Sequence, residues 1–281
     1  MPRHPWPLLP LLLGLAATTT AGETKQCTVI DSVPREITTQ GVYCLHQDLA
    51  SNVIGGRAIA ISASNVVLDC NGHTIYGNQV GDATNAFGVM AFERDNVSVR
   101  RCHLSGFRHG IWLRGRGATV EDNLVDASTT TGIYVYGDGG AVRGNRVLAT
   151  GGSPLDAGTA FGIRTYGDVD VLDNTIAGVQ ARAGSGAMAT GIYADVNDHG
   201  VVGENRVRDV RGDGAGMTVG IRVAGSVRAS LHDNHLSNPG VADAIGLQCP
   251  FATSGIASGN HVNGFETGMQ DCIDGGGNVL E

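Results

Sequence analysis

The stretch Gly132-Ile-Tyr-Val-Tyr-Gly-Asp-Gly-Gly-Ala-Val-Arg-Gly-Asn-Arg-Val147 decides the fold. It reads as a glycine, alternating apolar residues, a turn, and then Val-x-x-Asn-x-Val. The opening glycine recurs every 22 to 30 residues, at Gly88, Gly110, Gly132, Gly162, Gly191, Gly220, Gly246 and Gly268. A repeat of this period with strand-like alternation inside it is typical of stacked β-strands. The sequence therefore predicts an all-β solenoid.

Three apolar columns run through the repeats, which indicates three strands per coil and about nine coils. The first column is Val89, Ile111, Ile133, Ile163, Ile192, Ile221, Leu247 and Met269. The second is Val99, Val120, Val142, Val171, Val202, Leu231 and Ala257, and the third is Leu104, Val125, Val147, Ile176, Val207, Leu236 and Val262. Between the second and third lie Asn123, Asn145, Asn174, Asn205, Asn234 and Asn260, with Cys102 in the earlier coil. Stacked asparagines bond to one another, so we expect a structural ladder.

This repeat, with Asn65-Val-Val-Leu-Asp-Cys-Asn-Gly-His-Thr-Ile75, resembles the right-handed parallel β-helix superfamily of pectate lyases and related proteins. The resemblance covers roughly residues 58–270 and implies a single-stranded right-handed parallel β-helix. It does not imply one function, because the superfamily includes lyases, hydrolases, epimerases, tailspikes and non-catalytic proteins. The Asp-Pro-His of alginate epimerases, the Gly-His-Gly of polygalacturonases and the arginine motifs of pectate lyases are not found in the sequence. No family's catalytic residues are therefore transferred.

The chain divides into three segments. Residues 1–21 combine a basic start, an apolar run and small residues before Ala21, which predicts a secretory signal peptide. Residues 22–57 lack the full repeat and are expected to cap the first coil, and residues 58–281 form the predicted β-helix. No other stretch approaches the ~18 apolar residues of a membrane span, so we expect a secreted or periplasmic monomer. The net charge of −8 disfavours nucleic-acid binding.

Six cysteines in an exported chain indicate three disulfides. Alignment of the coils favours Cys70–Cys102 and Cys249–Cys272, because each pair falls near one corner of neighbouring coils. Cys27–Cys44 then remains to join the N-terminal cap. The cysteine spacing matches no zinc signature.

Aromatic and basic residues gather at the outward positions of the first strand. Exposed aromatic rings pack on sugar C–H faces, and arginines bind carboxylates, so these positions indicate an acidic polysaccharide. The candidate substrate-binding residues are Trp112, Arg114, Tyr134, Tyr136, Tyr166 and Asp195. The alternative is the ordinary preference of Tyr and Arg for exposed strands. Long connections at 148–161, 177–190, 208–219 and 237–245 are expected to form a wall of loops beside this face, unless they only reflect tolerated insertion.

Lyase or epimerase chemistry on a uronate needs a neutralised carboxylate and groups that move protons. The candidate catalytic residues are Arg164, Tyr193, Arg222 and His199, with Tyr134, Tyr166 and His109 as further proton carriers. Asp168, Asp170, Asp195 and Asp198 form a weak candidate site for Ca²⁺, although such residues commonly serve only as turns. A hydrolase is less favoured, since only Asp195 lies on this face. A non-catalytic glycan-binding module and a structural or interaction solenoid remain alternatives.

Overall fold

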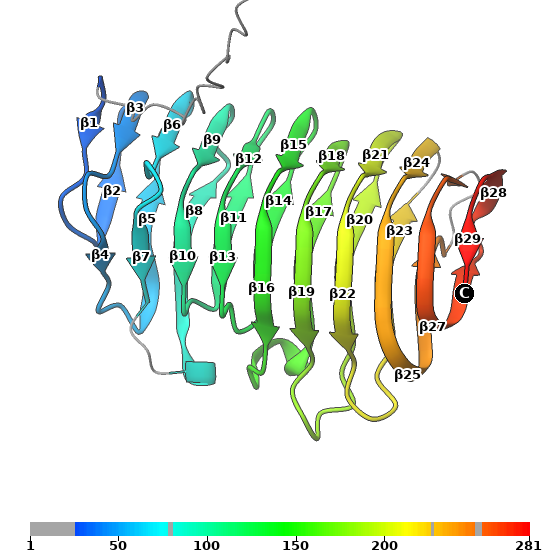
Figure 1. The fold of residues 1–281 in the computed structure, drawn as a ribbon. Helices are drawn as coiled ribbons and strands as arrows, with labels where there is room; N and C mark the ends of the chain where they lie inside the picture. The colour runs from blue at the N-terminus through cyan, green and yellow to red at the C-terminus, as the bar shows by residue number, and fades with distance from the viewer. Residues whose placement is uncertain (1–25, 78–80, 226–227, 251–254) are drawn as a thin grey trace, which may run out of the picture.

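The computed structural model describes residues 26–77, 81–225, 228–250 and 255–281. The predicted signal peptide lies outside these residues. The regular secondary structure of the described chain is β-strand apart from two short 3₁₀ segments, η1 (Gly81–Ala83) and η2 (Leu155–Gly158). Figure 1 shows the strands stacked side by side along one axis, from the N-terminal strands at one end to the C-terminal strands at the other. The all-β, right-handed parallel β-helix is confirmed.

Three runs of parallel strands form the walls of the helix. The first sheet comprises β2 (Arg35–Ile37), β5 (Gly55–Ile61), β8 (Asn85–Phe92), β11 (His109–Arg114), β14 (Thr131–Tyr136), β17 (Ala160–Tyr166), β20 (Ala189–Val196) and β23 (Thr218–Gly225). The second comprises β1 (Thr28–Val29), β3 (Gly41–Cys44), β6 (Val66–Asp69), β9 (Val97–Arg100), β12 (Thr119–Glu121), β15 (Gly140–Arg143), β18 (Val169–Leu172), β21 (His199–Gly203), β24 (Arg228–His232), β26 (Ile256–Ser258) and β28 (Ile273–Gly276).

The third sheet comprises β4 (Leu49–Ala50), β7 (Thr74–Tyr76), β10 (His103–Ser105), β13 (Leu124–Asp126), β16 (Arg146–Gly151), β19 (Thr175–Gln180) and β22 (Arg206–Arg211). Near the C-terminal end, β25 (His235–Gln248) and β27 (His261–Gln270) each run through both the third and the first sheet. The third sheet ends with β29 (Val279–Leu280), which pairs with the start of β27. Among the described residues no helix is long and apolar enough to cross a membrane.

The predicted columns hold the strands in register. Ile133 pairs with Ile111 on one side and with Ile163 on the other, although the sequence spacings differ. All three side chains are fully buried in the core. Burial of one apolar residue per strand in each coil therefore sets the register, because a shift of one residue would turn every such side chain toward water.

The asparagine ladder is also present at the bend between the second and third sheets. Each side-chain amide donates to the Oδ1 of the next asparagine over 2.9–3.0 Å, from Asn123 through Asn260. The backbone N–H of Cys102 caps one end by donating to Asn123. The ladder extends one step beyond the prediction, because Asn260 donates to Asn278 at 2.9 Å.

All six cysteines are paired as predicted, in Cys27–Cys44, Cys70–Cys102 and Cys249–Cys272. Each bridge joins neighbouring coils of the stack. Residues assigned to the N-terminal cap contribute β1 to β4, of which β3 and β4 already pair in parallel with β6 and β7.

The expected wall of loops is wrong at 237–245, because these residues lie inside β25. The other long connections are shortened by longer third-sheet strands. In β19, both Ile176 and Val179 are buried, since Gly178 between them has a left-handed φ of 72° and turns the chain. The same turn occurs at Ala149 and Asp209. Part of each insertion therefore fills the core instead of bordering the first sheet.

Candidate functional site

The outward side chains of the first sheet form two adjacent columns, as predicted. In the first column Trp112, Tyr134, Arg164, Tyr193 and Arg222 occupy matching positions of β11, β14, β17, β20 and β23. In the second column Arg114, Tyr136, Tyr166 and Asp195 do the same. These nine residues are called the aromatic–arginine surface below.

Aromatic rings on this surface pack against one another along the helix axis. The rings of Trp112 and Tyr134 stack with centroids 4.1 Å apart. The ring centroid of Tyr166 lies 5.8 Å from that of Tyr134, 5.9 Å from that of Tyr136 and 5.8 Å from that of Tyr193. Because the facing sides of Trp112 and Tyr134 cover each other, a ligand can reach only their edges and outer faces. The polar edges of the rings thus matter as much as their flat faces.

Arg164 lies among aromatic rings at the centre of the surface. Its guanidinium carbon is 4.5 Å from the ring centroid of Phe161, 5.0 Å from that of Tyr166 and 5.5 Å from that of Tyr193. Nη2 of Arg164 also donates a hydrogen bond to the hydroxyl of Tyr166. These contacts hold the side chain in one orientation and stabilise its charge through cation–π attraction.

The surface carries more positive than negative charge. Nη2 of Arg114 lies 3.8 Å from Oε1 of Glu93, and the two side chains form a partly exposed ion pair. By contrast, Arg164 and Arg222 have no ion-pair partner among the described residues, and the Nε of each has no hydrogen-bond partner there. Arg222 donates to Gln248 at 3.0 Å, which in turn donates to Gln270 at 3.0 Å. Two guanidinium groups that pair with no described carboxylate suit an anionic ligand.

Two tyrosines of the surface hold their protons more tightly than usual. Burial raises the pKa of Tyr134 and of Tyr193, and the charge of Asp195 adds to the effect at Tyr193. Both hydroxyls therefore act as hydrogen-bond donors and acceptors at neutral pH. A phenolate base is disfavoured at both positions.

His109 supports the surface from beneath. It is only 4% exposed, stacks on Phe87 with centroids 4.9 Å apart and meets Trp112 edge-on at 4.7 Å. Burial, together with the charge of Arg108, lowers the pKa of His109 to about 3. A neutral, covered imidazole positions Trp112 and is unsuited to carrying protons for a ligand.

His109 should make the protein less stable as the pH falls. Its pKa is about 3 in the folded state, against a usual value of 6.5, so the unfolded chain takes up the proton first below pH 6.5. Between pH 7 and pH 5 this costs about 2 kcal/mol of unfolding free energy. In urea unfolding, the unfolding free energy of His109→Phe should therefore fall between pH 7 and pH 5 by about 2 kcal/mol less than that of the wild type. His199→Phe, at an exposed site, should behave like the wild type. If the unfolding free energy changed equally with pH in all three proteins, the buried His109 would not be the source of the pH dependence.

His199 and three of the acidic candidates lie away from the aromatic–arginine surface. His199 begins β21 in the second sheet, with Nδ1 3.0 Å from Asp198 and Nε2 3.3 Å from Arg228. Asp168 accepts the backbone N–H groups of Asp198 and His199 at 2.9 and 3.1 Å, and Asp170 accepts that of Val201. Two of the four proposed Ca²⁺ ligands thus stabilise a corner of the coil, and the structure does not gather the four carboxylates into one cluster.

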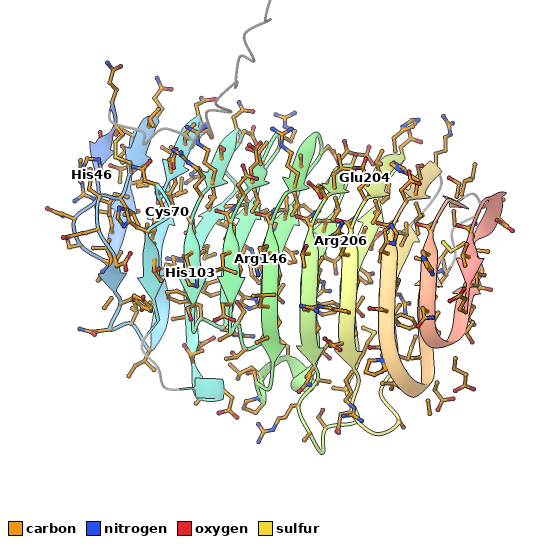
Figure 2. The ribbon with its side chains drawn as sticks, viewed as in Figure 1. His46, Cys70, His103, Arg146, Glu204 and Arg206 are labelled. Atoms are coloured by element: carbon orange, nitrogen blue, oxygen red, sulfur yellow. A yellow bond between two sulfur atoms is a disulfide. The ribbon has the colours of Figure 1, made fainter. Side chains whose placement is uncertain are left out.

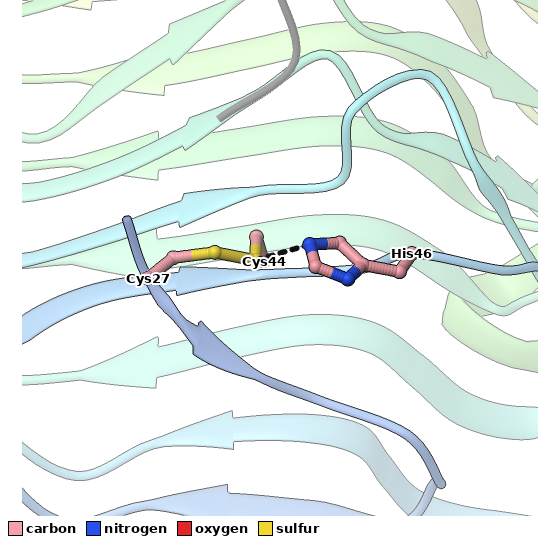
Figure 3. A group of neighbouring side chains, drawn as sticks. All are labelled: Cys27, Cys44 and His46. Atoms are coloured by element: carbon pink, nitrogen blue, oxygen red, sulfur yellow. Dashed lines mark hydrogen bonds between the residues drawn. A yellow bond between two sulfur atoms is a disulfide. The ribbon is translucent and has the colours of Figure 1, made fainter. Parts of the chain in front are cut away.

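Among the described residues one group of three has ligand atoms within 4.8 Å of one another, namely Cys27, Cys44 and His46 (Figure 3). Nε2 of His46 is 3.4 Å from Sγ of Cys44. The two sulfurs are joined in a disulfide, so neither is a thiolate that could bind a metal. This group does not fit a resident metal.

Sequence reasoning missed residues that complete the surface. Gln248 and Gln270 continue the first column, where their position two residues after Gly246 and Gly268 places them, but they were not among the candidate site residues. Phe161 gave no such signal, because simple alternation does not place the residue before the glycine beside the outward column.

Two solved tailspike proteins share the fold. The Dettilon tailspike aligns with a TM-score of 0.54 at 16% identity, over 89% of this chain and 56% of that one. Tailspike protein 2 of Escherichia coli O157:H7 bacteriophage CAB120 aligns with a TM-score of 0.51 at 12% identity, over 81% and 34%. The A-module of the Azotobacter vinelandii mannuronan C-5 epimerase AlgE6 aligns at 0.46 and 12% identity, over 88% and 87%. At these identities the likeness shows the fold alone, and the chain spans only part of either tailspike.

No curated protein matches the chain. A family model does match it, over residues 22–246, and that family is described as periplasmic copper-binding protein (NosD). The match covers most of the chain, including the predicted cap and both columns of the aromatic–arginine surface. This chain therefore belongs to the NosD family.

Proposed function

We propose that this protein binds an acidic polysaccharide along its aromatic–arginine surface, outside the cytoplasm. The observation that carries the proposal is the pair Arg164 and Arg222, two guanidinium groups in one column of aromatic side chains that have no ion-pair partner in the part of the chain that the structure describes. The family's description as periplasmic supports the predicted export.

The spacing of the column suits an extended chain of sugars. Neighbouring strands lie ~4.8 Å apart, so Arg164 and Arg222, two strands apart, repeat at roughly 10 Å. Carboxylates on alternate sugars of an extended uronate chain recur at a comparable distance. Tyr193 lies between the two arginines, where its hydroxyl can bond to a sugar hydroxyl. Along the column, the surface would then bind a carboxylate, a hydroxyl group and a second carboxylate of the glycan in turn.

Binding without turnover is the function this geometry supports best. Elimination or epimerisation requires a base near the uronate, and the raised pKa values of Tyr134 and Tyr193 disfavour that role. His109 is covered by Phe87 and Trp112, and His199 lies on the second sheet. Asp195, Tyr136 and Tyr166 are the groups left on this surface that could move a proton for a lyase or epimerase. Ultraviolet absorbance of an unsaturated product tests for a lyase, and exchange of the uronate C5 proton with solvent tests for an epimerase.

Removing both cations should weaken glycan binding. Each charge-assisted hydrogen bond contributes about 1.5–3 kcal/mol, so Arg164→Gln/Arg222→Gln should bind oligouronates at least about tenfold more weakly than the wild type. Isothermal titration with alginate and polygalacturonate oligomers, and with a neutral glucan of equal length, measures this. Arg143→Gln, at an exposed arginine paired with Glu121 on the second sheet, is the matched control and should bind normally. Equal affinity of wild type and double variant, or no preference for acidic over neutral glycan, would refute the proposal.

Copper binding is the second candidate, because the family's description names it. Thiolate ligands are not offered, since all six cysteines are in disulfides. The remaining candidate ligands are imidazoles and carboxylates, which suit Cu²⁺.

A further inference from the structure

A hollow on the outer face of the third sheet is bordered mainly by basic and hydrogen-bonding side chains. It has a volume of 630 Å³ and lies over β22, β25 and β27. Its basic residues are Arg206, Arg208, His235 and His261, and the carboxylate of Glu281 borders its far edge. A hollow of this size is in the range that holds a small organic molecule. The charge of its lining indicates an anionic one.

The two arginines of the hollow point outward from the same strand. Arg206 and Arg208 lie two residues apart in β22, so their side chains leave the same face of the sheet roughly 7 Å apart. Both are exposed, and neither has an ion-pair partner among the described residues. The adjacent Asp209 lines a different hollow. Figure 2 shows Arg206 on the same face as Arg146, with Glu204 above it at the bend that precedes β22.

The next strand adds two hydrogen-bonding side chains at matching positions. His235 is the register partner of Arg206, and Ser237 is that of Arg208. The four side chains therefore leave the sheet from the corners of a patch roughly 7 Å along the strand and ~4.8 Å across it. Their strands are held in place, because the backbone N–H groups of Arg206 and His235 each donate to the carbonyl of a ladder asparagine at 2.8 Å. Only the side chains need to adjust to a ligand.

The carboxylate of the hollow lies away from the arginines. Glu281 follows β29, which is three strands beyond β22 and therefore roughly 14 Å along the axis. Its Oε2 accepts a hydrogen bond from Asn263 at 3.1 Å and lies 3.9 Å from Nε2 of His261. Charges further apart than the Debye length of about 8 Å are largely screened at physiological salt. Glu281 therefore does not neutralise the arginine end of the hollow.

We infer that Arg206, Arg208, His235 and Ser237 form a binding site for a phosphate or sulfate ester. Such an ester group presents three free oxygens in three directions, so it can accept from both guanidinium groups and from the neighbouring strand at once. A carboxylate has two oxygens in one plane, and a single arginine fork satisfies it. The rest of the hollow, over β25 and β27, has room for the molecule that carries the ester. The site is separate from the aromatic–arginine surface, which lies on the first sheet.

The test is calorimetric titration of the full chain, with its disulfides intact, at physiological salt. The probes are glucose 6-phosphate and glucose 6-sulfate, with glucuronate and glucose as the carboxylate and neutral controls. At least one ester should bind at a single site and more tightly than glucuronate, and the stronger of the two identifies the preferred group. Arg206→Gln and Arg208→Gln should each weaken binding of that ester at least about tenfold, because each removes a charge-assisted hydrogen bond. Ser237→Ala, which removes a neutral one, should weaken it about threefold.

Arg146→Gln is the matched control. Arg146 is exposed in the same outward column, two strands before Arg206, but it does not border the hollow, so this variant should bind the ester like the wild type. Glu281→Gln should bind the ester as tightly as the wild type or more tightly, whereas the same change at a cation site would weaken binding. Circular dichroism checks that each variant is folded, which is expected because these side chains are exposed.

Three results would overturn the inference: no ester binding by the wild type, equal affinity for glucuronate, or the same affinity in Arg206→Gln and Arg208→Gln as in Arg146→Gln. The inference and the proposed glycan binding fail independently. Arg164→Gln/Arg222→Gln changes only the first sheet and should bind the ester normally, whereas Arg206→Gln/Arg208→Gln should bind oligouronates normally.

Discussion

Replacing Asn174 by alanine is expected to lower the free energy of unfolding by about 4 kcal/mol. The side chain is 1% exposed. Its amide donates to the carbonyls of Val142 and Leu172 at 2.9 Å and to Oδ1 of Asn205 at 3.0 Å. Its oxygen accepts both the backbone N–H and the side-chain amide of Asn145 at 3.0 Å. Truncation leaves at least two buried groups without partners, each costing about 1–3 kcal/mol, and adds a cavity.

Urea unfolding followed by circular dichroism, under non-reducing conditions, measures this loss. The matched control is Asn278→Ala at the end of the same ladder. Asn278 makes equivalent bonds to Asn260, but it is only partly buried, so water can replace them. We expect a loss of about 1 kcal/mol there. Equal losses at the two positions would show that burial does not determine the strength of the ladder.

The repeat predicted the fold because one physical constraint acts on every coil. A strand buried on one face must alternate, and a stacked asparagine must bond to its neighbours, so both features appear at fixed positions in each repeat. Residues such as Ile133 and Ile163 could therefore be paired across insertions of different length. Two of the disulfides, Cys70–Cys102 and Cys249–Cys272, followed from the same alignment, because two residues at one corner of adjacent coils lie within bonding reach. Cys27–Cys44 was then the pair that remained.

The insertions could not be predicted in the same way. A left-handed residue, such as Gly178, lets residues three apart both point inward. In the sequence, that spacing breaks the alternation and resembles a loop. Whether a longer connection becomes strand or loop depends on its fit to the coil above it. In β25 the amide of Asn238 bonds the N–H and the carbonyl of Val210, and this contact joins distant residues that no local pattern connects.

The candidate site was predictable as a set of positions but not as a set of contacts. Alternation placed Trp112, Tyr134 and Arg164 in one outward column. It could not show that Phe161 would lie beneath Arg164, because the alternation breaks at the glycine that follows Phe161. Nor could it show that His109 would be buried, since that depends on Phe87 from the preceding coil. Such contacts arise only when neighbouring coils are placed together.

Replacing the glycine that opens each repeat by alanine is expected to lower the free energy of unfolding nearly as much as replacing an asparagine of the ladder. At Gly162 an added Cβ would lie 2.5 Å from Cγ2 of Ile176 and 2.6 Å from the carbonyl oxygen of Gly191. There is therefore no room for a side chain at Gly162, because both of these atoms belong to the packed core and the neighbouring strand. Gly162→Ala should lower the unfolding free energy by about 3 kcal/mol, because the chain must move away from both atoms.

Two further variants decide whether the carbonyl contact is the cause. Ile176→Ala removes the side-chain clash but leaves the contact with the backbone of Gly191, so Gly162→Ala should cost about as much in the Ile176→Ala protein as it does in the wild type. Gly55→Ala is the matched control in β5, because an added Cβ there meets no atom within 4 Å and the change should be neutral or slightly stabilising. Thermal unfolding of the wild type, the three single variants and the double variant measures these differences. A much smaller cost of Gly162→Ala in the Ile176→Ala protein would assign the strain to Ile176, and the close approach of neighbouring backbones would then not be what requires glycine at the start of each coil.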